Sequence, residues 1–320
     1  MKELLLTAIG GPEHFALREA ESRTPGPNEI TVRNSAIGVN FIDIYQRTGL
    51  YPVAAPVVLG QEAAGVVTAA GPGAPFRAGE RVAYMGAAAY AEETVVDAGR
   101  AARLPPEVSE DAAAASFLKG LTAEMLLRQV YPAKAGETAL ITAAAGGVGL
   151  LLCQWAVHLG LRVIAVVGGP AKIAAVRAAG VADIIDRSQT PDIAGAVRTL
   201  TNGKGAAVAY DSVGKATFEA CLDSLSLRGM MVTYGNASGP VPAIAPLDLT
   251  RRGSLSLARP SLFHYATPDR LPGMAAALFD LLAKGVLKPT IAAAFPLAKG
   301  AEAHRLLEAG NTIGSIILKP

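Results

Sequence analysis

Short apolar segments separated by Pro and Gly turns dominate the first third of the chain. The turns include Pro-Gly-Pro at 25–27 and Gly-Pro-Gly at 71–73. Apolar and β-branched runs bounded by such residues are typical of strands. The pattern predicts strands at Glu3–Ile9, Phe15–Glu19, Glu29–Ala36, Ala63–Ala70, Arg81–Tyr84 and Ala91–Val96. Residues 1–121 are therefore predicted to be mainly β.

From residue 122 to 261, apolar strands alternate with helix-like segments. The strands are predicted at 138–142, 162–168, 183–186, 206–211, 229–235 and 253–258. The helices are predicted near 147–159, 170–179, 190–200 and 215–226. A regular alternation of this kind predicts an α/β domain with a doubly wound parallel sheet, the Rossmann arrangement.

After Pro260 the pattern becomes mixed, with a helix near 270–284, an apolar stretch at 290–297, a helix near 299–309 and a terminal strand at 315–318. This tail has too little core to stand alone, and 320 residues suit two domains better than one. We therefore expect residues 1–121 and 262–320 to form one domain, into which a dinucleotide-binding domain of residues 122–261 is inserted.

A glycine-rich turn lies at the centre of the predicted Rossmann domain. Residues 144–149 read Ala-Ala-Gly-Gly-Val-Gly between an apolar strand and a helix with an apolar face. In such a turn Gly146 lets backbone N–H groups approach a pyrophosphate, and Gly149 lets the helix pack closely on the strand. The helix N-terminus then presents unpaired N–H groups to the phosphates. An ordinary glycine- and alanine-rich turn is the alternative, but the following strand at 162–168 completes a βαβ unit.

Composition and charge exclude several classes of function. The formal net charge of +2 and the absence of a basic run with interleaved aromatics argue against nucleic-acid binding. No window approaches the apolar length of a membrane span, and residues 1–12 do not resemble a signal peptide. Cys153 and Cys221 lie in apolar helical contexts and are expected to be buried free thiols. We therefore expect a soluble cytoplasmic protein.

The residues after the second Rossmann strand bear on the choice between NAD and NADP. An NAD-selective site carries Asp or Glu there, about 20 residues after the glycine turn, to bind the ribose hydroxyls. Here Gly168 and Gly169 occupy that place, and Lys172 follows. The missing carboxylate and the nearby cation favour NADPH. The alternative for Lys172 is a solvated surface lysine.

Together these residues resemble a known family. The chain is similar to the zinc-independent quinone oxidoreductases, the zeta-crystallin branch of the medium-chain dehydrogenase/reductase superfamily. The resemblance runs nearly end to end, through residues 38–52, 59–65, 120–123, 144–149, 210–214, 234–239, 259–261 and 314–318. It implies a Rossmann domain inserted in a mostly β, GroES-like catalytic domain, and a homodimer. It also implies NADPH-dependent one-electron or hydride reduction of quinones or other α,β-unsaturated carbonyls (enones).

The resemblance also implies positions for the site residues. The substrate pocket would be lined by Asn40, Asp43, Tyr45, Tyr51 and Thr122. The cofactor would contact Gly146, Gly147, Val148, Gly168, Lys172, Asn236, Ser238 and Arg259 in the 259–261 turn. This chain departs from the bacterial members at Asp186, where they often carry Tyr, and near Gly310, where they often carry Arg. An Asp at 186 would oppose a 2′-phosphate, so strict preference for NADPH is left open.

No metal is expected. A catalytic zinc needs about three protein ligands, which zinc alcohol dehydrogenases of the superfamily take partly from a Gly-His-Glu tripeptide. Here that tripeptide is Gly60-Gln61-Glu62, and glutamine is a poor zinc ligand. Two cysteines cannot build a four-cysteine structural lobe, and the four histidines are scattered without ligand spacing.

Without zinc, other groups must polarise the substrate carbonyl. The hydroxyls of Tyr45 and Tyr51 could donate hydrogen bonds to a developing oxyanion, and the Asn40 amide could do the same. Thr122 could orient the nicotinamide or the substrate. The alternatives are structural: the tyrosines would then only cover an edge of the β domain, and Asn40 would only cap the helix predicted near 41–48. Asp43 and Glu62 are expected to hold that region in place, Glu62 through an ion pair.

Three functions remain open at this point. The first is an NADPH:quinone or enone reductase, acting on a small-molecule substrate. The second is an enoyl-thioester reductase of the same superfamily, although the basic patch that an acyl carrier would need does not stand out. The third is a catalytically quiet NADPH-binding protein.

Overall fold

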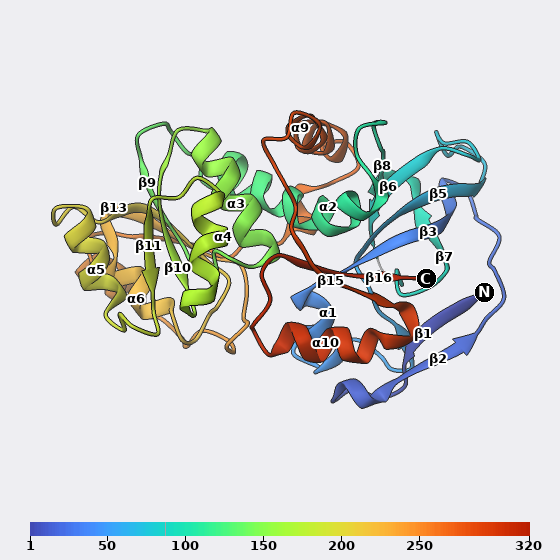
Figure 1. Cartoon of the computed structure of the whole chain (residues 1–320), viewed down its shortest axis with the longest axis horizontal. Coiled ribbons are helices and arrows are strands. Elements are labelled where there is room, and N and C mark those ends of the chain that lie inside the picture. Colours follow the sequence, from blue (N-terminus) through green and yellow to red (C-terminus); the bar gives the residue numbers. More distant parts are fainter. Residues whose placement is uncertain (87) are drawn as a thin grey trace. The chain divides into compact units, whose positions relative to one another are not determined.

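The computed structural model describes residues 1–86 and 88–320, which divide into two compact units (Figure 1). Unit 1 comprises Met1–Leu121 and Ala266–Pro320, and unit 2 comprises Thr122–Tyr265. The chain thus leaves unit 1 once, builds unit 2 and returns.

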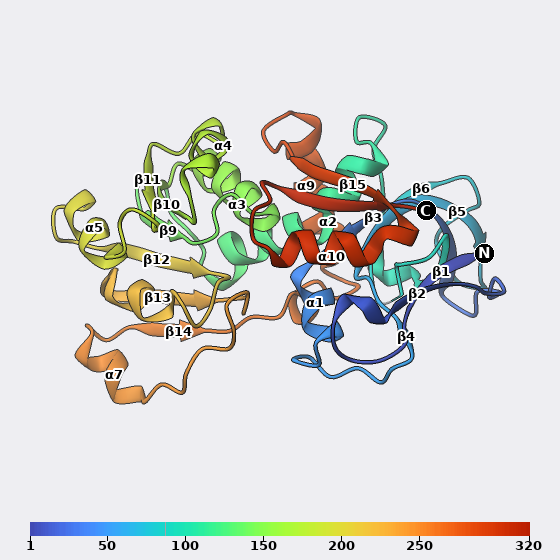
Figure 2. The ribbon, with the colours of Figure 1, turned by 60° about the horizontal axis from the view of Figure 1, so that its bottom comes forward.

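Unit 2 contains a six-stranded sheet in the order β11-β10-β9-β12-β13-β14, and every neighbouring pair is parallel (Figure 2). Its strands are β9 (Thr138–Ile141), β10 (Arg162–Val167), β11 (Asp183–Asp186), β12 (Ala206–Asp211), β13 (Leu225–Thr233) and β14 (Ser256–Ala258). Numbered within the unit, this order is 3-2-1-4-5-6, the order of a dinucleotide-binding sheet. The predicted doubly wound parallel sheet is confirmed.

Helices connect these strands. They are α3 (Gly147–His158), the 3₁₀ turn η4 (Pro170–Lys172), α4 (Ile173–Ala178), α5 (Ile193–Leu200), α6 (Phe218–Asp223), α7 (Pro246–Arg251) and α8 (Leu262–Tyr265). The core of the unit lies between sheet and helices, and includes Leu140, Ile164, Phe218 and Met231. The central strands β9, β10 and β12 are buried on both faces and therefore carry nearly continuous apolar runs, which is why the sequence pattern predicted them.

Unit 1 is built on a seven-stranded sheet. Its main path is β15-β16-β3-β5-β6-β8, and β7 pairs with β3. These strands are β3 (Glu29–Val39), β5 (Glu62–Ala70), β6 (Arg81–Met85), β7 (Glu93–Asp97), β8 (Ala101–Arg103), β15 (Ile291–Pro296) and β16 (Ser315–Lys319). A smaller sheet joins β1 (Lys2–Leu6), β2 (Phe15–Glu19) and β4 (Val57–Val58). Because β16 pairs antiparallel with β3, the last residues of the chain complete the sheet begun by the first forty.

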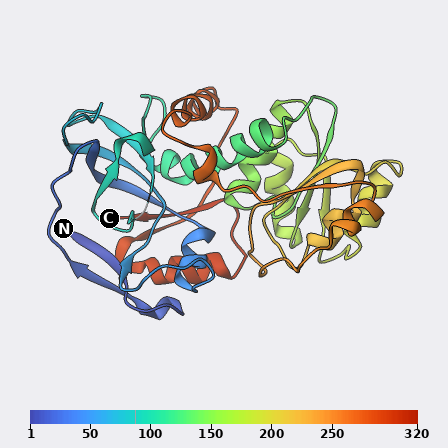
Figure 3. The same cartoon turned by 180° about the vertical axis from the view of Figure 1, so that it is seen from behind.

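Among the described residues of unit 1, four α-helices belong wholly or partly to it: α1 (Phe41–Arg47), α2 (Glu110–Glu124), α9 (Leu271–Ala283) and α10 (Gly300–Glu308). Three short 3₁₀ turns accompany them: η1 (Pro12–His14), η2 (Ala98–Arg100) and η5 (Leu297–Lys299). The C-terminal helix α10 lies beside α1, as the red and blue helices of Figure 3 show. Residues far apart in the sequence therefore meet around α1.

The sequence pattern did not predict α2. Almost every residue from 113 to 127 is buried, so this helix, continued by the π-helical turn η3 (Met125–Val130), has no polar face. A helix buried on all sides lacks the polar–apolar period that reveals an amphipathic helix. Among the described residues no helix has the length and apolarity needed to cross a membrane.

Candidate functional site

The glycine turn links β9 to α3 as its spacing predicts. Gly146 is the N-cap of α3, its amide donates to Ala143 O at 2.9 Å, and Leu150 N donates back to Gly146 O at 2.9 Å. A Cβ on Gly149 would lie 2.2 Å from Ala143 O, which no side chain tolerates. The first turn of α3, with Gly147 and Val148, is thereby held against the end of β9. Its free N–H groups and positive dipole end fit a pyrophosphate.

Asp211, at the end of β12, organises the neighbouring edge of the sheet. The strand order reverses between β9 and β12, and this reversal is where ligands bind in such sheets. Asp211 is fully buried, and its Oδ1 accepts from Thr142 Oγ1 and Thr217 Oγ1, each at 2.6 Å. Gly214 N donates to its Oδ2 at 3.0 Å. Asp211 was not among the predicted site residues, although it stands in the family motif at 210–214.

The loops after β13 and β14 bring Asn236 and Arg259 together. Arg259 Nη1 donates to Gly235 O at 3.2 Å, and in the amide orientation that satisfies both groups Arg259 Nη2 donates to Asn236 Oδ1 at 2.9 Å. Ser238 has a different part: its Oγ donates to Val213 O at 2.8 Å and accepts from Ala216 N at 2.9 Å. The Ser238 hydroxyl therefore fastens this loop to the loop after β12.

The carboxyl end of β10 is open and positively charged. The nearest atom to a Cβ placed on Gly168 would be Arg187 Nε, at 3.5 Å. Burial, and then the charge of Arg187, lower the pKa of Lys172 below its usual value, so the two cations lie within electrostatic reach. Arg187 was missed by the sequence reasoning, because it follows β11 rather than β10.

Asp186 precedes Arg187, and among the described residues only one oxygen of its carboxylate is hydrogen-bonded, while Oδ2 is buried without a partner. Its Oδ1 accepts from Ser188 Oγ at 2.8 Å and from Ser188 N at 3.0 Å, which closes a tight turn after β11. The side chain is buried, with 8 % of the residue exposed, whereas Arg187 is exposed. Asp186 therefore supports the turn that carries Arg187.

In unit 1 the candidate substrate residues gather around α1. Asn40 is the N-cap of α1, and its N–H donates to Asp43 Oδ2 at 2.8 Å. The rings of Tyr45 and Tyr51 meet edge to face with centroids 5.1 Å apart, and Tyr51 N donates to Tyr45 O at 2.9 Å. The structure thus brings the predicted residues Tyr45 and Tyr51 into contact and places Asn40 at the start of the helix that carries Tyr45. Asp43 ties down this helix as expected.

A buried ion pair stands next to Asn40. Glu62 is fully buried, forms an ion pair with Lys119 and accepts from Leu118 N at 2.7 Å. Asn40 Nδ2 donates to Glu62 Oε1 at 2.9 Å and, weakly, to Gly38 O at 3.4 Å. The predicted ion pair of Glu62 is confirmed. Both amide protons of Asn40 are therefore directed at protein acceptors.

Thr122, the fourth predicted catalytic residue, lies near the end of α2, and only 8 % of it is exposed. It is the first residue of unit 2, whereas Asn40, Tyr45 and Tyr51 belong to unit 1. Its proposed part in orienting substrate or nicotinamide stays a prediction.

Comparison with known proteins matches both units. The alcohol dehydrogenase GroES-like domain model matches residues 26–106, and the zinc-binding dehydrogenase model matches residues 147–280. A quinone oxidoreductase of Pseudomonas aeruginosa is 45% identical over 100% of this chain and 99% of its own length. A 2-haloacrylate reductase of a Burkholderia species is 42% identical over 97% of this chain and 96% of its own.

Solved structures agree with this. The Escherichia coli quinone oxidoreductase complexed with NADPH superposes with a TM-score of 0.97 at 42% identity, covering 100% of both chains. The chain belongs to the quinone oxidoreductase, zeta-crystallin-like branch of the medium-chain dehydrogenases/reductases. The family expected from the sequence is confirmed, as are the Rossmann and GroES-like folds.

The matching family model is described as zinc-binding, but the residues of this chain do not fit a catalytic zinc. At the place of the histidine ligand, Gln61 Nε2 donates to Gln46 Oε1 at 3.2 Å, and Glu62 is engaged by Lys119. Burial raises the pKa of the Cys153 thiol to about 12 and that of Cys221 well above its usual value, which disfavours the thiolate that zinc requires. Within residues 1–86 and 88–320, no three His, Cys, Asp or Glu side chains form a possible metal site.

Proposed function

We propose that this protein is an NADPH-dependent, zinc-independent reductase of quinones or other α,β-unsaturated carbonyl compounds. The observation that carries the proposal lies at the carboxyl edge of the parallel sheet. There the turn before α3 requires glycine at position 149, and the cations Lys172 and Arg187 lie at the same edge. The relatives support the substrate class, since quinones and 2-haloacrylates share an electron-poor C=C bond conjugated to a carbonyl or carboxylate. The E. coli structure supports the cofactor.

The residues present fit a dinucleotide with a 2′-phosphate. We assign the pyrophosphate to the first turn of α3 at Gly146, Gly147 and Val148, and the 2′-phosphate to Lys172 and Arg187 beside Gly168. Two cations held near one another are stabilised by a dianion. Asp186, bound to Ser188 through one oxygen only, still opposes a 2′-phosphate, so Lys172 and Arg187 must outweigh it. Asn236 and Arg259 would line the nicotinamide side, with Ser238 holding their loop.

The cofactor preference is tested with Lys172→Ala and Arg187→Ala. Each change removes a charge-assisted contact, so we expect the KM for NADPH to rise about 10- to 100-fold while the KM for NADH changes little. Arg177→Ala is the matched control, because Arg177 is an exposed cation on α4, the helix that begins directly after Lys172. Equal effects of Lys172→Ala on both cofactors would contradict the assignment of the 2′-phosphate to this pair.

When NADPH is bound it supplies the hydride, and the chain's own residues must position and polarise the acceptor. We assign the donors of hydrogen bonds to the acceptor oxygen to the Tyr45 and Tyr51 hydroxyls. Asn40, which is hydrogen-bonded to Glu62 and Asp43, would shape the pocket. Thr122 would orient the reacting groups. Because quinones are good hydride acceptors, two such donors suffice without a metal or a dedicated acid.

The test is NADPH oxidation by a panel of ortho- and para-quinones, enones and enoyl thioesters. We expect turnover with quinones or enones, and a loss of about 10- to 1,000-fold in kcat for Tyr45→Phe or Tyr51→Phe with the enone, the weaker acceptor. Tyr131→Phe is the control, because Tyr131 lies by Glu137 at the amino ends of the strands. Unchanged turnover in both pocket variants would remove the oxyanion role, and NADPH binding without any acceptor would refute the reductase.

We also propose a homodimer. In unit 2, β14 is an edge strand of the sheet, and exposed leucines lie on or near it. Leu227 is 79% exposed, Leu247 55% and Leu257 36%. An apolar edge strand pairs readily with another chain unless it is covered. Leu257→Lys should convert a dimer to a monomer in sedimentation velocity, and an unchanged sedimentation coefficient would place the interface elsewhere.

A further inference from the structure

Six buried polar residues of unit 1 form one continuous hydrogen-bonded chain. The residues of this buried polar network are Lys119, Glu62, Asn40, Asp43, Tyr90 and His304, none of them more than 6% exposed. Lys119 pairs with Glu62, Glu62 accepts from the Asn40 side chain, and the Asn40 N–H donates to Asp43. Beyond it, Tyr90 Oη donates to Asp43 Oδ2 at 2.9 Å and lies 2.9 Å from His304 Nε2. The network thus runs from α2, through the N-cap of α1, to α10.

The directions of these hydrogen bonds follow from counting protons. While Asp43 is ionised, Tyr90 gives its one hydroxyl proton to Asp43, so His304 donates its Nε2–H to the Tyr90 oxygen. His304 Nδ1 is then the bare nitrogen, which agrees with its being buried without a partner among the described residues. The other tautomer would bury an N–H with nothing to accept it, at a larger cost than a bare nitrogen.

Burial and charge make Asp43 the group of this network that titrates near neutrality. Burial raises the pKa of Asp43 to about 7, against the hydrogen bonds from Asn40 and Tyr90 and the charge of Lys119, while the charge of Glu62 raises it further. Its Oδ1 has no hydrogen-bond partner among the described residues, so the ionised form is only partly satisfied.

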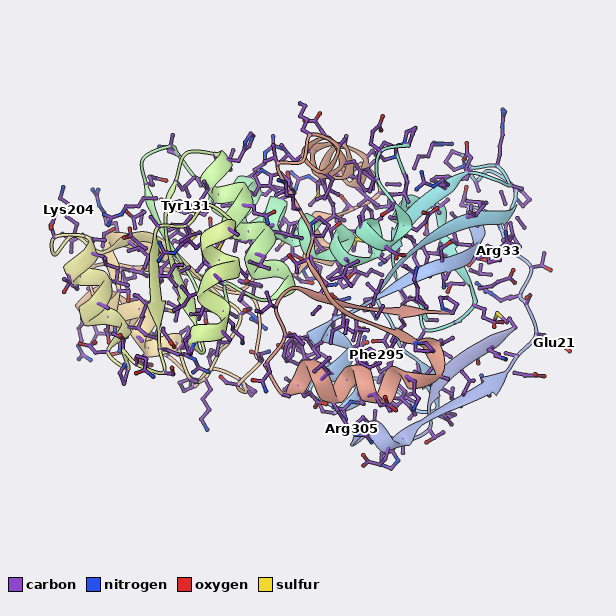
Figure 4. The ribbon with its side chains drawn as sticks, in the orientation of Figure 1. Glu21, Arg33, Tyr131, Lys204, Phe295 and Arg305 are labelled. Carbon is purple, nitrogen blue, oxygen red and sulfur yellow. The ribbon has the colours of Figure 1, made fainter. Side chains whose placement is uncertain are left out.

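Burial and the nearby charge of Arg47 keep His304 neutral. Burial, and then the charge of Arg47, lower the pKa of His304 to about 3, and Arg47 is itself paired with Glu308. Arg305, labelled in Figure 4, is the next residue of α10 and is exposed, whereas His304 is fully buried. His304 therefore serves as a neutral donor.

We propose that Tyr90 and His304 are positioning residues that act through Asp43: His304 orients the Tyr90 hydroxyl, Tyr90 holds the Asp43 carboxylate ionised, and the carboxylate anchors the Asn40 N–H at the start of the helix carrying Tyr45. Protonation of Asp43 weakens both hydrogen bonds to its Oδ2 and loosens this anchor. The reductase then loses activity on the acid side of neutrality. This step rests on the proposed function, whereas the proton arrangement does not.

The proton arrangement is tested by nitrogen NMR of protein labelled with ¹⁵N-histidine. The chain has four histidines, so His304→Gln assigns the signal. We expect His304 to be neutral from pH 4.5 to 8, and to be the Nε2–H tautomer at pH 8, where Asp43 is ionised. In Tyr90→Phe, which removes its acceptor, the Nε2 shift should move. An Nδ1–H tautomer at pH 8, or a His304 that protonates above pH 5, would overturn the proposal.

The positioning role is tested by the pH dependence of kcat/KM for a quinone. We expect the acid limb of the profile to move by about half a pH unit or more to higher pH in Tyr90→Phe, because the ionised Asp43 loses a donor. Asp43→Asn, which still accepts but cannot titrate, should lose the limb. Tyr84→Phe is the matched control: Tyr84 is fully buried in the same unit and donates to Asn34 Oδ1 at 3.0 Å, outside the network.

The outcomes separate the two proposals. If Tyr90→Phe and Tyr84→Phe leave the acid limb equally unmoved, the positioning role is refuted while the reductase stands. If the wild-type chain reduces no acceptor, the proposed function fails, and the tautomer measurement still decides the proton arrangement.

Discussion

The cofactor edge of unit 2 and the buried polar network of unit 1 obtain their geometry in different ways. At the cofactor edge the backbone does the positioning: Gly149 must lack a side chain because a Cβ would meet Ala143 O, and the N–H groups of α3 point outward. In the network, side chains from five segments position one another, and its members lie between residues 40 and 304. The first arrangement is local and open to a ligand, whereas the second is long-range and closed to water.

The largest expected effect is a loss of unfolding free energy in Lys119→Met, which tests whether the network is closed to water. The change leaves the fully buried Glu62 carboxylate without its counter-charge, and breaking a buried ion pair costs about 3–5 kcal/mol of unfolding free energy. The double variant with Glu62→Gln should recover much of this, since no charge is then stranded. Urea unfolding measures both.

Lys299→Met is the control for that change, because Lys299 and Glu302 form an exposed pair in the same unit. Such a pair contributes less than about 1 kcal/mol. A loss from Lys119→Met no greater than that of the control would mean that water reaches the network and that the contrast with the cofactor edge is overstated.

A second prediction concerns pH, where Asp43 and His304 act in opposite directions. The folded pKa of Asp43 is raised to about 7, so the native state holds the proton more tightly, and this contribution to stability falls as pH rises from about 4 to 7. The folded pKa of His304 is lowered to about 3, so its contribution rises with pH until about 6.5. In the wild type these two opposite dependences of unfolding free energy on pH largely cancel.

Single variants should expose each slope. As the pH rises from 4.5 to 7, the unfolding free energy of Asp43→Asn should increase relative to that of wild type. As the pH rises from 4.5 to 6.5, the unfolding free energy of His304→Gln should decrease relative to that of wild type. Each difference should be on the order of 3 kcal/mol, at 1.36 kcal/mol per pKa unit. Parallel stability curves for wild type and both variants would show that neither group titrates as its burial implies.

The same contrast explains what the sequence could predict. The glycine turn, Gly168 and Lys172 were found because a strand, a turn and a helix follow one another within thirty residues, and local periodicity reveals each of them. Asn40, Tyr45 and Tyr51 came only through family resemblance. Tyr90, His304 and Arg187 were missed, because nothing within a few residues of any of them indicates its partner. The buried helix α2, which supplies Lys119, was missed for lack of a polar face.

The smallest expected effect tests the backbone side of the comparison. In Gly149→Ala the added Cβ would lie 2.2 Å from Ala143 O and 2.8 Å from Ala144 Cα, so the turn must shift. We expect a loss of about 1–3 kcal/mol in stability, as for overpacking in a core, together with weaker NADPH binding. Gly273→Ala is the control: Gly273 lies in α9 with nothing within 4 Å of its would-be Cβ, so alanine should stabilise by about 0.5–1 kcal/mol. If Gly149→Ala bound NADPH as tightly as wild type and matched Gly273→Ala in unfolding, close backbone approach would not be what forms the cofactor edge.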